Sequence, residues 1–282
     1  MTEADVERKR LSKILKARFS DMPTLPADFP ANSLLTSIAG RGSCRSYTGQ
    51  EVPFSWLHAL SSIALSSPTK SDLQQRDIII VQDAAKRAGL ARTMSGQSWI
   101  AAAPALIVFC GNNRRQRLLH EWHDMTFAND HLDAFFNATA DAAIALSTFV
   151  TAAETVGLGC CPISAIRNQA QAVSDLLGLP DHVFPMAGLA VGFPSKPREV
   201  SKRLPLHVTV HSDAYGEDDL DQAVSTYDAE RAIAQPYEKQ RYEDAFGTSQ
   251  NYCWSQDKVR QYSRPERSDF GDFIRSKGFD LK

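Results

Sequence analysis

The densest group of chemically useful side chains lies between Arg41 and Tyr47. This segment reads Arg-Gly-Ser-Cys-Arg-Ser-Tyr, so two arginines four residues apart accompany a glycine and two serines. An arginine guanidinium can pair with two phosphate oxygens at once, and Gly42 allows a ligand to approach the backbone closely. The segment fits a binding site for a phosphate-bearing ligand. It fits a surface turn with two solvated arginines equally well.

A second polar group, residues 95–99 (SGQSW), stands just before an apolar run. Gln97 supplies an amide that donates and accepts hydrogen bonds, and Trp99 supplies an indole, a combination that suits a planar heterocycle. Residues 201–203 (SKR) add positive charge much later in the chain. No Ser/His/Asp arrangement and no pair of catalytic carboxylates emerges from the sequence. An enzyme of this sequence would therefore depend on a bound cofactor for its reactive group.

Two Gly-x-Gly sequences fall short of the dinucleotide-binding fingerprint. Gly40-x-Gly42 lacks the third glycine and follows a predicted helix rather than a strand. Pro162 stands where the third glycine after Gly157-x-Gly159 belongs. A Walker lysine motif is also absent from the sequence, so neither a Rossmann site nor a P-loop is predicted.

Three further motifs favour structural roles over catalytic ones. Ser67 and Lys70 have the spacing of serine acyl-enzymes, but the companion motifs are missing from the sequence. His120 and His123 are three residues apart rather than four, which favours a surface helix end over a metal site. The adjacent cysteines at 160–161 have no nearby cation, so we expect buried and unreactive thiols.

The composition is that of a globular protein with a balanced charge. The 282 residues include 31 Lys and Arg against 33 Asp and Glu, and 43% are hydrophobic. This balance argues against a nucleic-acid partner. The N-terminal residues have no apolar signal core, and the longest apolar run, Trp99 to Cys110, is too short to span a bilayer. Five cysteines without a CxxC pair favour a reduced compartment. We expect a cytoplasmic protein with no membrane contact.

Hydrophobic patterning predicts several helices and three or four separated strands. Helices are expected at residues 3–19, 34–38, 54–65, 84–88, 141–156 and 168–177. Strands are expected at 78–81, 105–110 and 186–193, with shorter strand-like segments at 160–163 and 207–210. The helix at 141–156 has few polar faces, which places it inside a core or a dimer interface. This mixture of elements indicates an α+β or α/β fold.

Composition shifts along the chain predict three parts. Residues 1–32 form an N-terminal arm, because three prolines between residues 22 and 32 interrupt regular structure after the first helix. Residues 33–212 form the main body. Residues 213–282 form a C-terminal extension that packs on the core or on a dimer partner. It begins with the acidic stretch 213–230, which is expected to be a solvated face or loop.

The order of these motifs resembles the flavin-dependent nitroreductase superfamily, in particular its branch of NADPH-preferring nitroreductases and flavin reductases. The resemblance covers residues 33–275. It rests on Arg41-x-Ser43-x-Arg45-x-Tyr47, Gly96-Gln97-x-Trp99, Glu154-x-x-Gly157-Leu-Gly159, Ile166-Arg167-Asn168, Leu176-x-Gly178-Leu-Pro180, Gly188-x-x-x-Gly192-x-Pro194, Arg203-Leu204-Pro205 and Trp254-Ser255.

The resemblance implies an α+β, nitroreductase-like fold with a central, mainly antiparallel sheet packed by helices. It also implies an intertwined homodimer that binds FMN noncovalently at its interface. By the match, Arg41, Arg45 and Arg203 would hold the FMN phosphate, with Gly42 beside them, and Ser43 would hold the ribityl chain. Many relatives have histidine at the first of these positions, and Arg41 keeps the positive charge there.

For the flavin ring, the match places Gln97 at the polar edge, with Thr69 and Trp99 nearby. A segment of four residues would pass over the ring, namely Pro162, Ile163, Ser164 and Ala165. Its backbone N–H groups would lie near the reactive nitrogen of the flavin. Relatives often have two glycines in place of Ser164 and Ala165. They also have a lysine where this chain has serine at 201, a role that Lys202 can take.

The implied function is an FMN-dependent NAD(P)H oxidoreductase with a ping-pong hydride mechanism, in which the flavin rather than a side chain carries the chemistry. Nitroaromatics, quinones or flavins would be the small-molecule acceptors. A flavin reductase that releases reduced FMN, and a flavin-binding protein without catalysis, are the alternatives. No metal site is expected.

The preference between NADPH and NADH follows from the cations available for the 2′-phosphate of NADPH. The arginine that contacts this phosphate in relatives falls near Phe246, and residues 246–251 contain no basic residue. We therefore expect the efficiencies with NADPH and NADH to lie within about tenfold. Substitutes would be Arg241 or Lys258, or an arginine at 114, 115 or 117.

Overall fold

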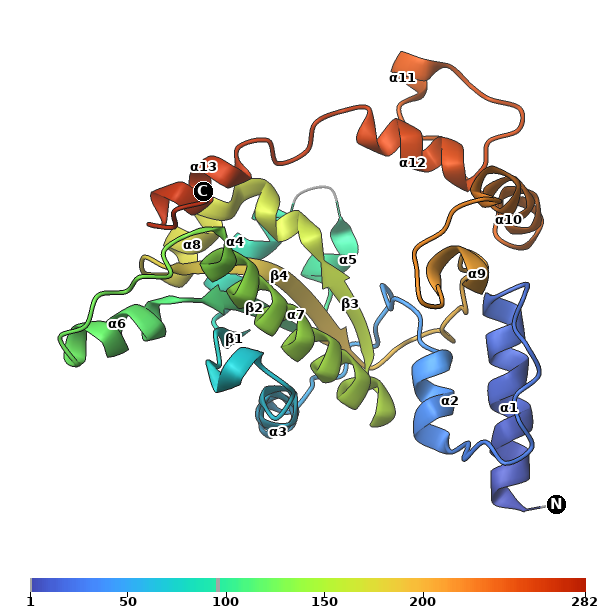
Figure 1. The fold of residues 1–282 in the computed structure, drawn as a ribbon, viewed down its shortest axis with the longest axis horizontal. Coiled ribbons are helices and arrows are strands. Elements are labelled where there is room, and N and C mark those ends of the chain that lie inside the picture. Colours follow the sequence, from blue (N-terminus) through green and yellow to red (C-terminus); the bar gives the residue numbers. More distant parts are fainter. Residues whose placement is uncertain (1, 95–96) are drawn as a thin grey trace. The chain divides into compact units, whose positions relative to one another are not determined.

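The computed structural model describes residues 2–94 and 97–282, and it divides the chain into two compact units (Figure 1). We name them the sheet unit and the helical unit. The sheet unit comprises Ser43–Arg198 and Arg267–Lys282. The helical unit comprises Met1–Gly42 and Glu199–Glu266. The three-part division drawn from composition stays a prediction.

The sheet unit is built around an antiparallel sheet to which the described residues contribute four strands. They are β1 (Arg76–Val81), β2 (Ala105–Asn112), β3 (Gly159–Ile163) and β4 (Val183–Gly192), in the order β1-β2-β4-β3. Each neighbouring pair is antiparallel. The β-branched and aromatic residues of β1 and β2 favour extended backbone, which explains why both strands were predicted from the sequence. Pro162 interrupts hydrogen bonding in β3, which is tolerated because β3 is an edge strand.

Side chains alternate along each strand, so both faces of the sheet carry apolar residues. Helices cover both of these faces. Ile107 and Phe109 of β2 are buried against one layer, and Leu106 and Val108 are buried against the other. The first layer contains α3 (Phe54–Leu65), α7 (Leu132–Thr155) and α13 (Phe270–Ser276). The second layer contains α4 (Ala84–Thr93), α5 (Ser98–Ala101), the 3-10 helix η2 (Ser164–Gln169) and α8 (Ala170–Leu177). The remaining elements of this unit are η1 (Lys70–Asp72) and α6 (Arg114–Trp122).

The long helix α7 begins nine residues before the predicted start at Asp141. Small residues such as Ala134 and Ala138 extend its buried stripe toward the N-terminus. By length and composition α7 could cross a bilayer, but it packs on the sheet and on α3, as a core helix does. Its opposite face is not buried in the single chain, since Phe136 is 64% exposed and Ile144 is 38% exposed.

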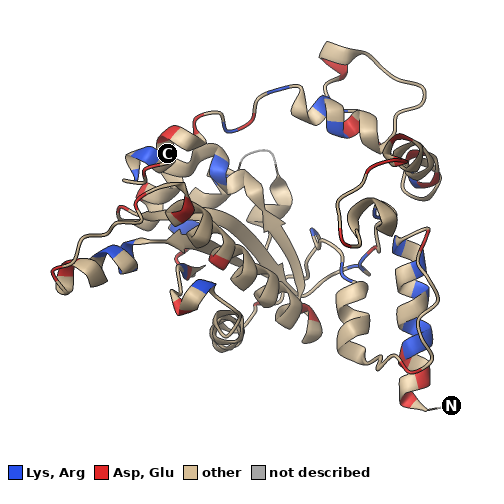
Figure 2. Cartoon of the chain, viewed as in Figure 1, with Lys and Arg blue, Asp and Glu red and all other residues tan. Residues whose placement is uncertain are grey.

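The helical unit consists of short helices joined by irregular segments. They are α1 (Glu3–Arg18), α2 (Ser33–Ala39), α9 (Leu206–Thr209), α10 (Leu220–Ala234), α11 (Glu243–Phe246) and α12 (Trp254–Tyr262). Within this unit α1 packs on α2, and α10 packs on α12. Basic side chains follow one another along α1 (Figure 2). Part of the stretch expected to be a solvated face or loop forms α10, where Ala223 and Tyr227 are buried one helical turn apart.

The predicted strand at 207–210 is wrong. These residues lie in and just after α9, a four-residue helix that starts after Pro205. The β-branched residues Val208 and Val210 suggested a strand, but the fixed backbone of Pro205 suits a helix start. The carboxylate of Asp21 accepts hydrogen bonds from the backbone N–H groups of Leu206 (2.7 Å) and His207 (3.0 Å), which stabilises this short helix.

Candidate functional site

Ser43 and Arg45 lie on an extended segment along the edge of the sheet. The Cys44 N–H donates to the Cys160 carbonyl of β3 at 2.9 Å, and the Cys44 side chain is buried. Because side chains alternate along extended backbone, Ser43 and Arg45 on either side are exposed. The sheet therefore holds the middle of this segment and leaves its hydroxyl and guanidinium groups accessible to a ligand.

Two glycines of the family motif allow this segment to lie against the sheet. A Cβ atom at Gly159 would lie 2.6 Å from Cys44 Sγ, and one at Gly192 would lie 2.8 Å from the Tyr47 ring. Separations this short are not sustained in folded proteins, so a larger residue at either position would displace the segment. The motif glycines thus position Arg45 without contacting it.

The guanidinium of Arg45 lies over the indole of Trp99, 5.7 Å from the ring centre. The sequence predicts that both residues contact the same ligand, and the two lie together within the sheet unit. Gln97 is exposed beside Trp99. The motif residues Ser95 and Gly96 lie outside the described part of the chain. A cation next to an aromatic face can accommodate a ligand that is both anionic and planar.

The predicted ring-crossing segment forms the turn from β3 into η2. Pro162 and Ser164 are exposed, Ile163 is buried, and Ala165 is half-buried. The N–H groups of the first helical turn have no partner inside a helix, so the start of η2 offers donors to a ligand. The buried Ile163 anchors this turn in the second helical layer.

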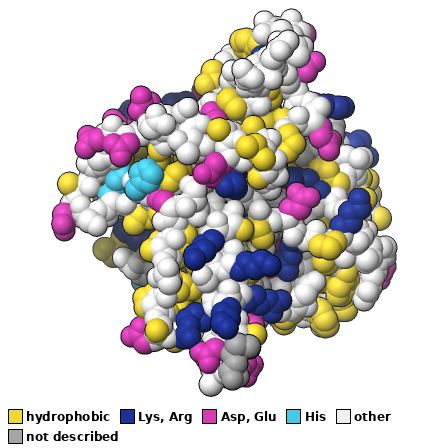
Figure 3. All heavy atoms as spheres, turned by 90° about the vertical axis from the view of Figure 1, so that its right-hand side faces the viewer, with side chains coloured by type: hydrophobic (Ala, Val, Ile, Leu, Met, Phe, Trp, Pro, Cys, Tyr) yellow, Lys and Arg dark blue, Asp and Glu magenta, His cyan; other side chains and the backbone are white. Residues whose placement is uncertain are grey.

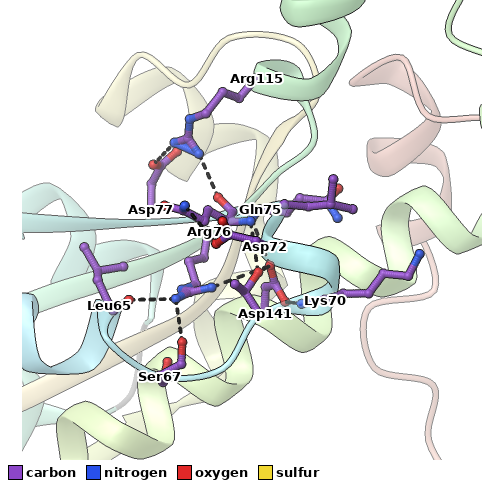
Figure 4. A network of polar contacts seen from close by, with 12 residues as sticks. Leu65, Ser67, Lys70, Asp72, Gln75, Arg76, Asp77, Arg115 and Asp141 are labelled. Atoms are coloured by element: carbon purple, nitrogen blue, oxygen red, sulfur yellow. Dashed lines mark hydrogen bonds and ion pairs between the residues drawn. The ribbon is translucent and has the colours of Figure 1, made fainter.

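A polar cluster surrounds the buried carboxylate of Asp141 (Figure 4). Thr69 belongs to this cluster. Asp141 accepts hydrogen bonds from the Thr69 hydroxyl and from the N–H groups of Lys70 (3.0 Å) and Gln75 (2.8 Å). The Thr69 hydroxyl also accepts a hydrogen bond from the Gln74 N–H at 2.9 Å. The hydroxyl thus serves the loop between α3 and β1. Its contact with a flavin ring stays a prediction.

Arg76 completes this cluster from the first residue of β1. Its guanidinium lies 3.7 Å from Asp141 and donates to the carbonyls of Leu65 (2.8 Å) and Ser67 (2.9 Å). The side chains of Arg76 and Asp141 are 3% and 1% exposed, so the ion pair is buried. We name the two residues and their backbone partners the Arg76–Asp141 clamp. The clamp fixes both ends of the loop that carries Thr69.

In the helical unit, the buried Arg18 connects the segments of Arg41 and Arg203. The Arg18 guanidinium donates to the carbonyls of Ala39, Arg41 and Ser201. The Arg203 N–H donates to the Arg18 carbonyl at 2.8 Å. Two of the predicted phosphate ligands therefore come from segments that are bound to the same buried residue.

The other predicted residues of the helical unit differ in exposure and pairing. Lys202 forms an ion pair with Glu230 at 2.6 Å, so its charge is partly compensated. Arg203 is exposed and donates to the Ser201 hydroxyl at 2.6 Å. Gly42 is buried. Of the predicted cofactor residues, Arg41, Gly42, Lys202 and Arg203 belong to the helical unit, and Ser43 and Arg45 belong to the sheet unit.

Most of the arginines considered for the NADPH phosphate are held in ion pairs. These pairs are Arg115–Asp77 (2.6 Å), Arg117–Asp130 (2.5 Å) and Arg241–Asp257 (3.2 Å). A guanidinium held by a carboxylate is a weaker ligand for a second anion, because its charge is already compensated.

Four of the five cysteines, Cys44, Cys110, Cys160 and Cys161, are buried and therefore poor candidates for nucleophiles. Cys160 and Cys161 are both buried, as predicted. Burial also raises the pKa of the Cys44 thiol. A thiol that is protonated at neutral pH is a poor nucleophile.

Sequence reasoning missed Arg18, Arg76 and Asp141, which position site residues without being predicted to touch the ligand. Asp141 carried a usable signal, since it is an acid inside an otherwise apolar helix stretch and a buried acid requires a partner. Arg18 and Arg76 carried no comparable signal, because their partners are mostly backbone carbonyls that any sequence can provide.

Comparisons with known proteins identify the family of this chain. The model of the nitroreductase family matches residues 38–193, and that of its C-terminal domain matches residues 201–282. The chain is 30% identical to FMN reductase [NAD(P)H] of Bacillus subtilis, over 89% of this chain and 99% of the relative. It is 28% identical to NADPH-flavin oxidoreductase of Vibrio harveyi, over 88% of this chain and 98% of the relative.

Solved structures show the same relationship. NfrA2 of B. megaterium superposes with a TM-score of 0.81 at 31% identity, covering 89% of this chain and 99% of the other. The NADPH:FMN oxidoreductase of Vibrio harveyi, solved in complex with NAD+, superposes with a TM-score of 0.76 at 27% identity, covering 88% and 98%. The motif glycines, the antiparallel sheet and these matches together show that the chain belongs to the nitroreductase family.

Proposed function

We propose that this member of the nitroreductase family, an FMN-dependent NAD(P)H oxidoreductase, delivers its electrons to nitroaromatics, quinones or flavins. The observation that carries the proposal is the exposed segment with Ser43 and Arg45, whose guanidinium lies over Trp99. It combines a cation for a phosphate, a hydroxyl for a sugar-like chain and an aromatic wall for a ring. FMN has these three parts.

The described residues fit FMN by the chemistry of their donors. Arg45 and Arg203 are exposed cations, and Arg41 shares the buried anchor Arg18 with Arg203. These three would hold the phosphate, each through charge-assisted hydrogen bonds. The exposed Gln97 would meet the polar edge of the ring, and the N–H groups at the start of η2 would face its reactive side.

Hydride uptake from NAD(P)H and electron delivery to an acceptor are the chemistry that a bound FMN supplies. The protein contributes to that chemistry through electrostatic stabilisation. Reduction adds negative charge to the ring, and oriented N–H groups and cations stabilise such charge without reorganising. The motif glycines fix the segment that presents Arg45, and the Arg76–Asp141 clamp fixes the loop that carries Thr69.

A second function, release of reduced FMN to other proteins, is favoured by the names of the relatives. Two relatives of Bacillus subtilis, 30% and 29% identical to this chain, are named FMN reductases. In this version of the proposal FMN is a substrate as well as a cofactor.

The proposed assembly is a cytoplasmic homodimer. The face of α7 that is turned away from the sheet carries Phe136 and Ile144, which are exposed in the single chain. Trp56 and Ile63 of the adjacent α3 are 44% and 52% exposed. A neighbouring copy would cover these apolar side chains, and the apolar character of α7 supports this assignment.

An anaerobic titration tests the proposed activity. The purified protein is expected to carry a yellow chromophore that bleaches when NADPH or NADH is added and returns with a nitroaromatic or a quinone. A reduced flavin whose colour returns with none of these acceptors would contradict the proposed electron delivery. Gel filtration after reduction then separates the two enzymes, since a flavin reductase loses its reduced flavin and a nitroreductase retains it.

A further inference from the structure

Glu154 is a buried carboxylate near the C-terminus of α7. Figure 3 shows one face of the molecule, on which Lys, Arg, Asp and Glu side chains lie at the surface. Charged groups are normally solvated in this way, and they are almost never fully buried without a partner. The Glu154 side chain is 3% exposed, so it requires a group that compensates its charge.

The position of Glu154 within the helix adds to this requirement. Glu154 lies in the last turn of α7. Partial negative charge from the backbone carbonyls collects at the C-terminus of a helix, so an acidic side chain is unfavourable there. Residues 152–155 read AAET, and the sequence of this turn therefore has no basic residue. The compensating charge must come from another segment of the chain.

Arg198 supplies this charge from the segment that follows β4. Its Nη1 atom lies 3.2 Å from Oε2 of Glu154. Because β4 ends at Gly192, the ion pair joins the end of α7 to the end of residues 193–198. Solvent screens a pair with a buried member less than it screens a surface pair. The ion pair therefore fixes the course of this segment.

The segment fixed by Arg198 runs beside the segment of the candidate site. Residues 193–195 lie antiparallel to residues 46–48. The Ser195 N–H donates to the Ser46 carbonyl at 3.0 Å, and the two serine hydroxyls lie 2.6 Å apart. Backbone that is paired in this way moves together, so a displacement of the first segment is passed to the second.

Cys44 shows that the ion pair acts close to the site residues. Burial has the largest effect on the Cys44 thiol and raises its pKa, the charge of Arg198 lowers this pKa, and the charge of Glu154 raises it. Both charged groups thus act on the residue between Ser43 and Arg45. The ion pair supports the site segment at the point where its two exposed side chains begin.

We propose that Glu154 is a positioning residue for the phosphate of FMN. It holds residues 193–198 through Arg198, and these residues hold the backbone that carries Arg45. Because Glu154 is buried, it acts through this backbone rather than by contact with the ligand. The inference rests on the proposed function, in which FMN is the bound cofactor.

A comparison of FMN with riboflavin separates positioning from general support of the fold. Riboflavin has the ring and the ribityl chain of FMN but lacks the phosphate that Arg45 would bind. Glu154→Gln keeps the size of the side chain and removes its charge. We expect this variant to bind FMN about tenfold more weakly, the equivalent of one charge-assisted hydrogen bond, and to bind riboflavin within about twofold of the wild type.

Two measurements on the purified holoprotein give these affinities. The fluorescence of flavin released on dilution gives the affinity for FMN. Exchange of bound FMN against added riboflavin gives the ratio of the two affinities. Asp130→Asn is the matched control, because it removes the carboxylate from another arginine ion pair of the sheet unit, in which Arg117 lies 2.5 Å from Asp130. The control is expected to keep the wild-type affinity for both flavins.

Variants of Arg198 test the same ion pair from its other member. The Arg198 side chain is 23% exposed, so its replacement disturbs the core less than that of Glu154. Arg198→Gln is expected to reproduce the selective loss of FMN affinity. Arg198→Lys keeps the positive charge and is expected to retain most of that affinity. These two variants decide the proposal even where Glu154→Gln does not fold.

A double-mutant cycle identifies the group through which Glu154 acts. In a protein that already carries Arg45→Gln, the further change Glu154→Gln is expected to weaken FMN binding by less than about twofold, because the guanidinium that Glu154 positions is absent. Full additivity of the two losses would show that Glu154 does not act through Arg45. Urea unfolding of the same proteins reports their stability separately.

Other results would also overturn the proposal. Equal losses of FMN and riboflavin affinity would show that Glu154 only supports the fold. An unchanged FMN affinity in folded Glu154→Gln and Arg198→Gln would remove the positioning role and leave the proposed oxidoreductase intact, provided that the wild type is reduced by NADPH or NADH. A wild-type protein that binds no FMN would overturn the proposed function together with the inference.

Discussion

At the scale of single residues, the role of each arginine follows from what already surrounds its guanidinium. Arg18 is 5% exposed and donates to carbonyls, so it shapes the backbone. Arg45 and Arg203 are exposed and remain available to a ligand. The sequence alone could not separate these roles, because burial and carbonyl partners depend on the folded backbone. The family motif identified Arg45 and Arg203, whereas Arg18 required the structure.

The double variant Arg41→Ala with Arg45→Ala is expected to lose FMN during purification. Each charge-assisted hydrogen bond to the phosphate contributes about 1.5–3 kcal/mol, so removing two residues abolishes retention. The ratio of flavin absorbance to protein absorbance measures this loss, with Lys239→Ala as the control. Full flavin occupancy in the folded double variant would refute the assignment of the phosphate ligands.

Asp21 gives the start of α9 a dependence on pH. Burial raises the pKa of Asp21, but hydrogen bonds from the N–H groups of Leu206 and His207 outweigh it and hold the pKa below 3.8. A carboxyl with a lowered folded-state pKa stabilises the fold when ionised, and this stabilisation is lost as the pH falls through the folded pKa.

Asp21→Asn is therefore expected to be less stable than the wild type at pH 7 and equally stable once the pH is well below 3.8. Urea unfolding at several pH values measures this difference. A stability gap that stays constant down to the acid limit would show that the Asp21 charge is not responsible.

At the scale of elements, the buried strands and the C-terminal part of α7 were predictable because most of their residues are apolar, whereas the more polar first turns of α7 were missed. The segment at 207–210 was not, because Asp21, nearly 190 residues away in sequence, determines its conformation. The helices α10 and α12 bury few residues, namely Ala223 and Tyr227 on α10 and the charged Asp257 and Arg260 on α12. A weak pattern of this kind does not distinguish a helix from a solvated loop.

The Arg76–Asp141 clamp is an element-scale device, since it ties η1 and the start of β1 to α7. Asp141→Asn is expected to destabilise the protein by about 3–5 kcal/mol, because it leaves the buried guanidinium of Arg76 without its counter-charge. Chemical denaturation measures the effect, and Glu121→Gln, which removes an exposed carboxylate on α6, is the control. A loss below about 1 kcal/mol would show that the backbone hydrogen bonds alone hold the loop.

At the scale of the whole molecule, the exposed apolar face of α7 and α3 predicts a stable homodimer. Obligate interfaces bury about 2,000 Å² or more, and a glutamate at the centre of one disrupts it by desolvation. We expect a dimer mass by light scattering at micromolar concentration. Ile144→Glu is expected to give monomers that lose flavin, and Met125→Glu, at a loop residue that is 66% exposed, is expected to remain dimeric. A flavin-loaded wild-type monomer would contradict this assembly.

The backbone of residues 43–48 also closes an open margin of the sheet. The Cys44 N–H donates a hydrogen bond to the Cys160 carbonyl of the edge strand β3. The Thr48 N–H donates to the carbonyl of Phe193, the residue after β4, at 2.8 Å. An edge strand without such a cover can pair with the edge of another molecule and start aggregation. The segment that would hold FMN therefore also occupies an edge that could otherwise pair with another molecule. A change that detaches it, such as Cys44→Pro, is expected to produce turbidity on warming together with loss of colour.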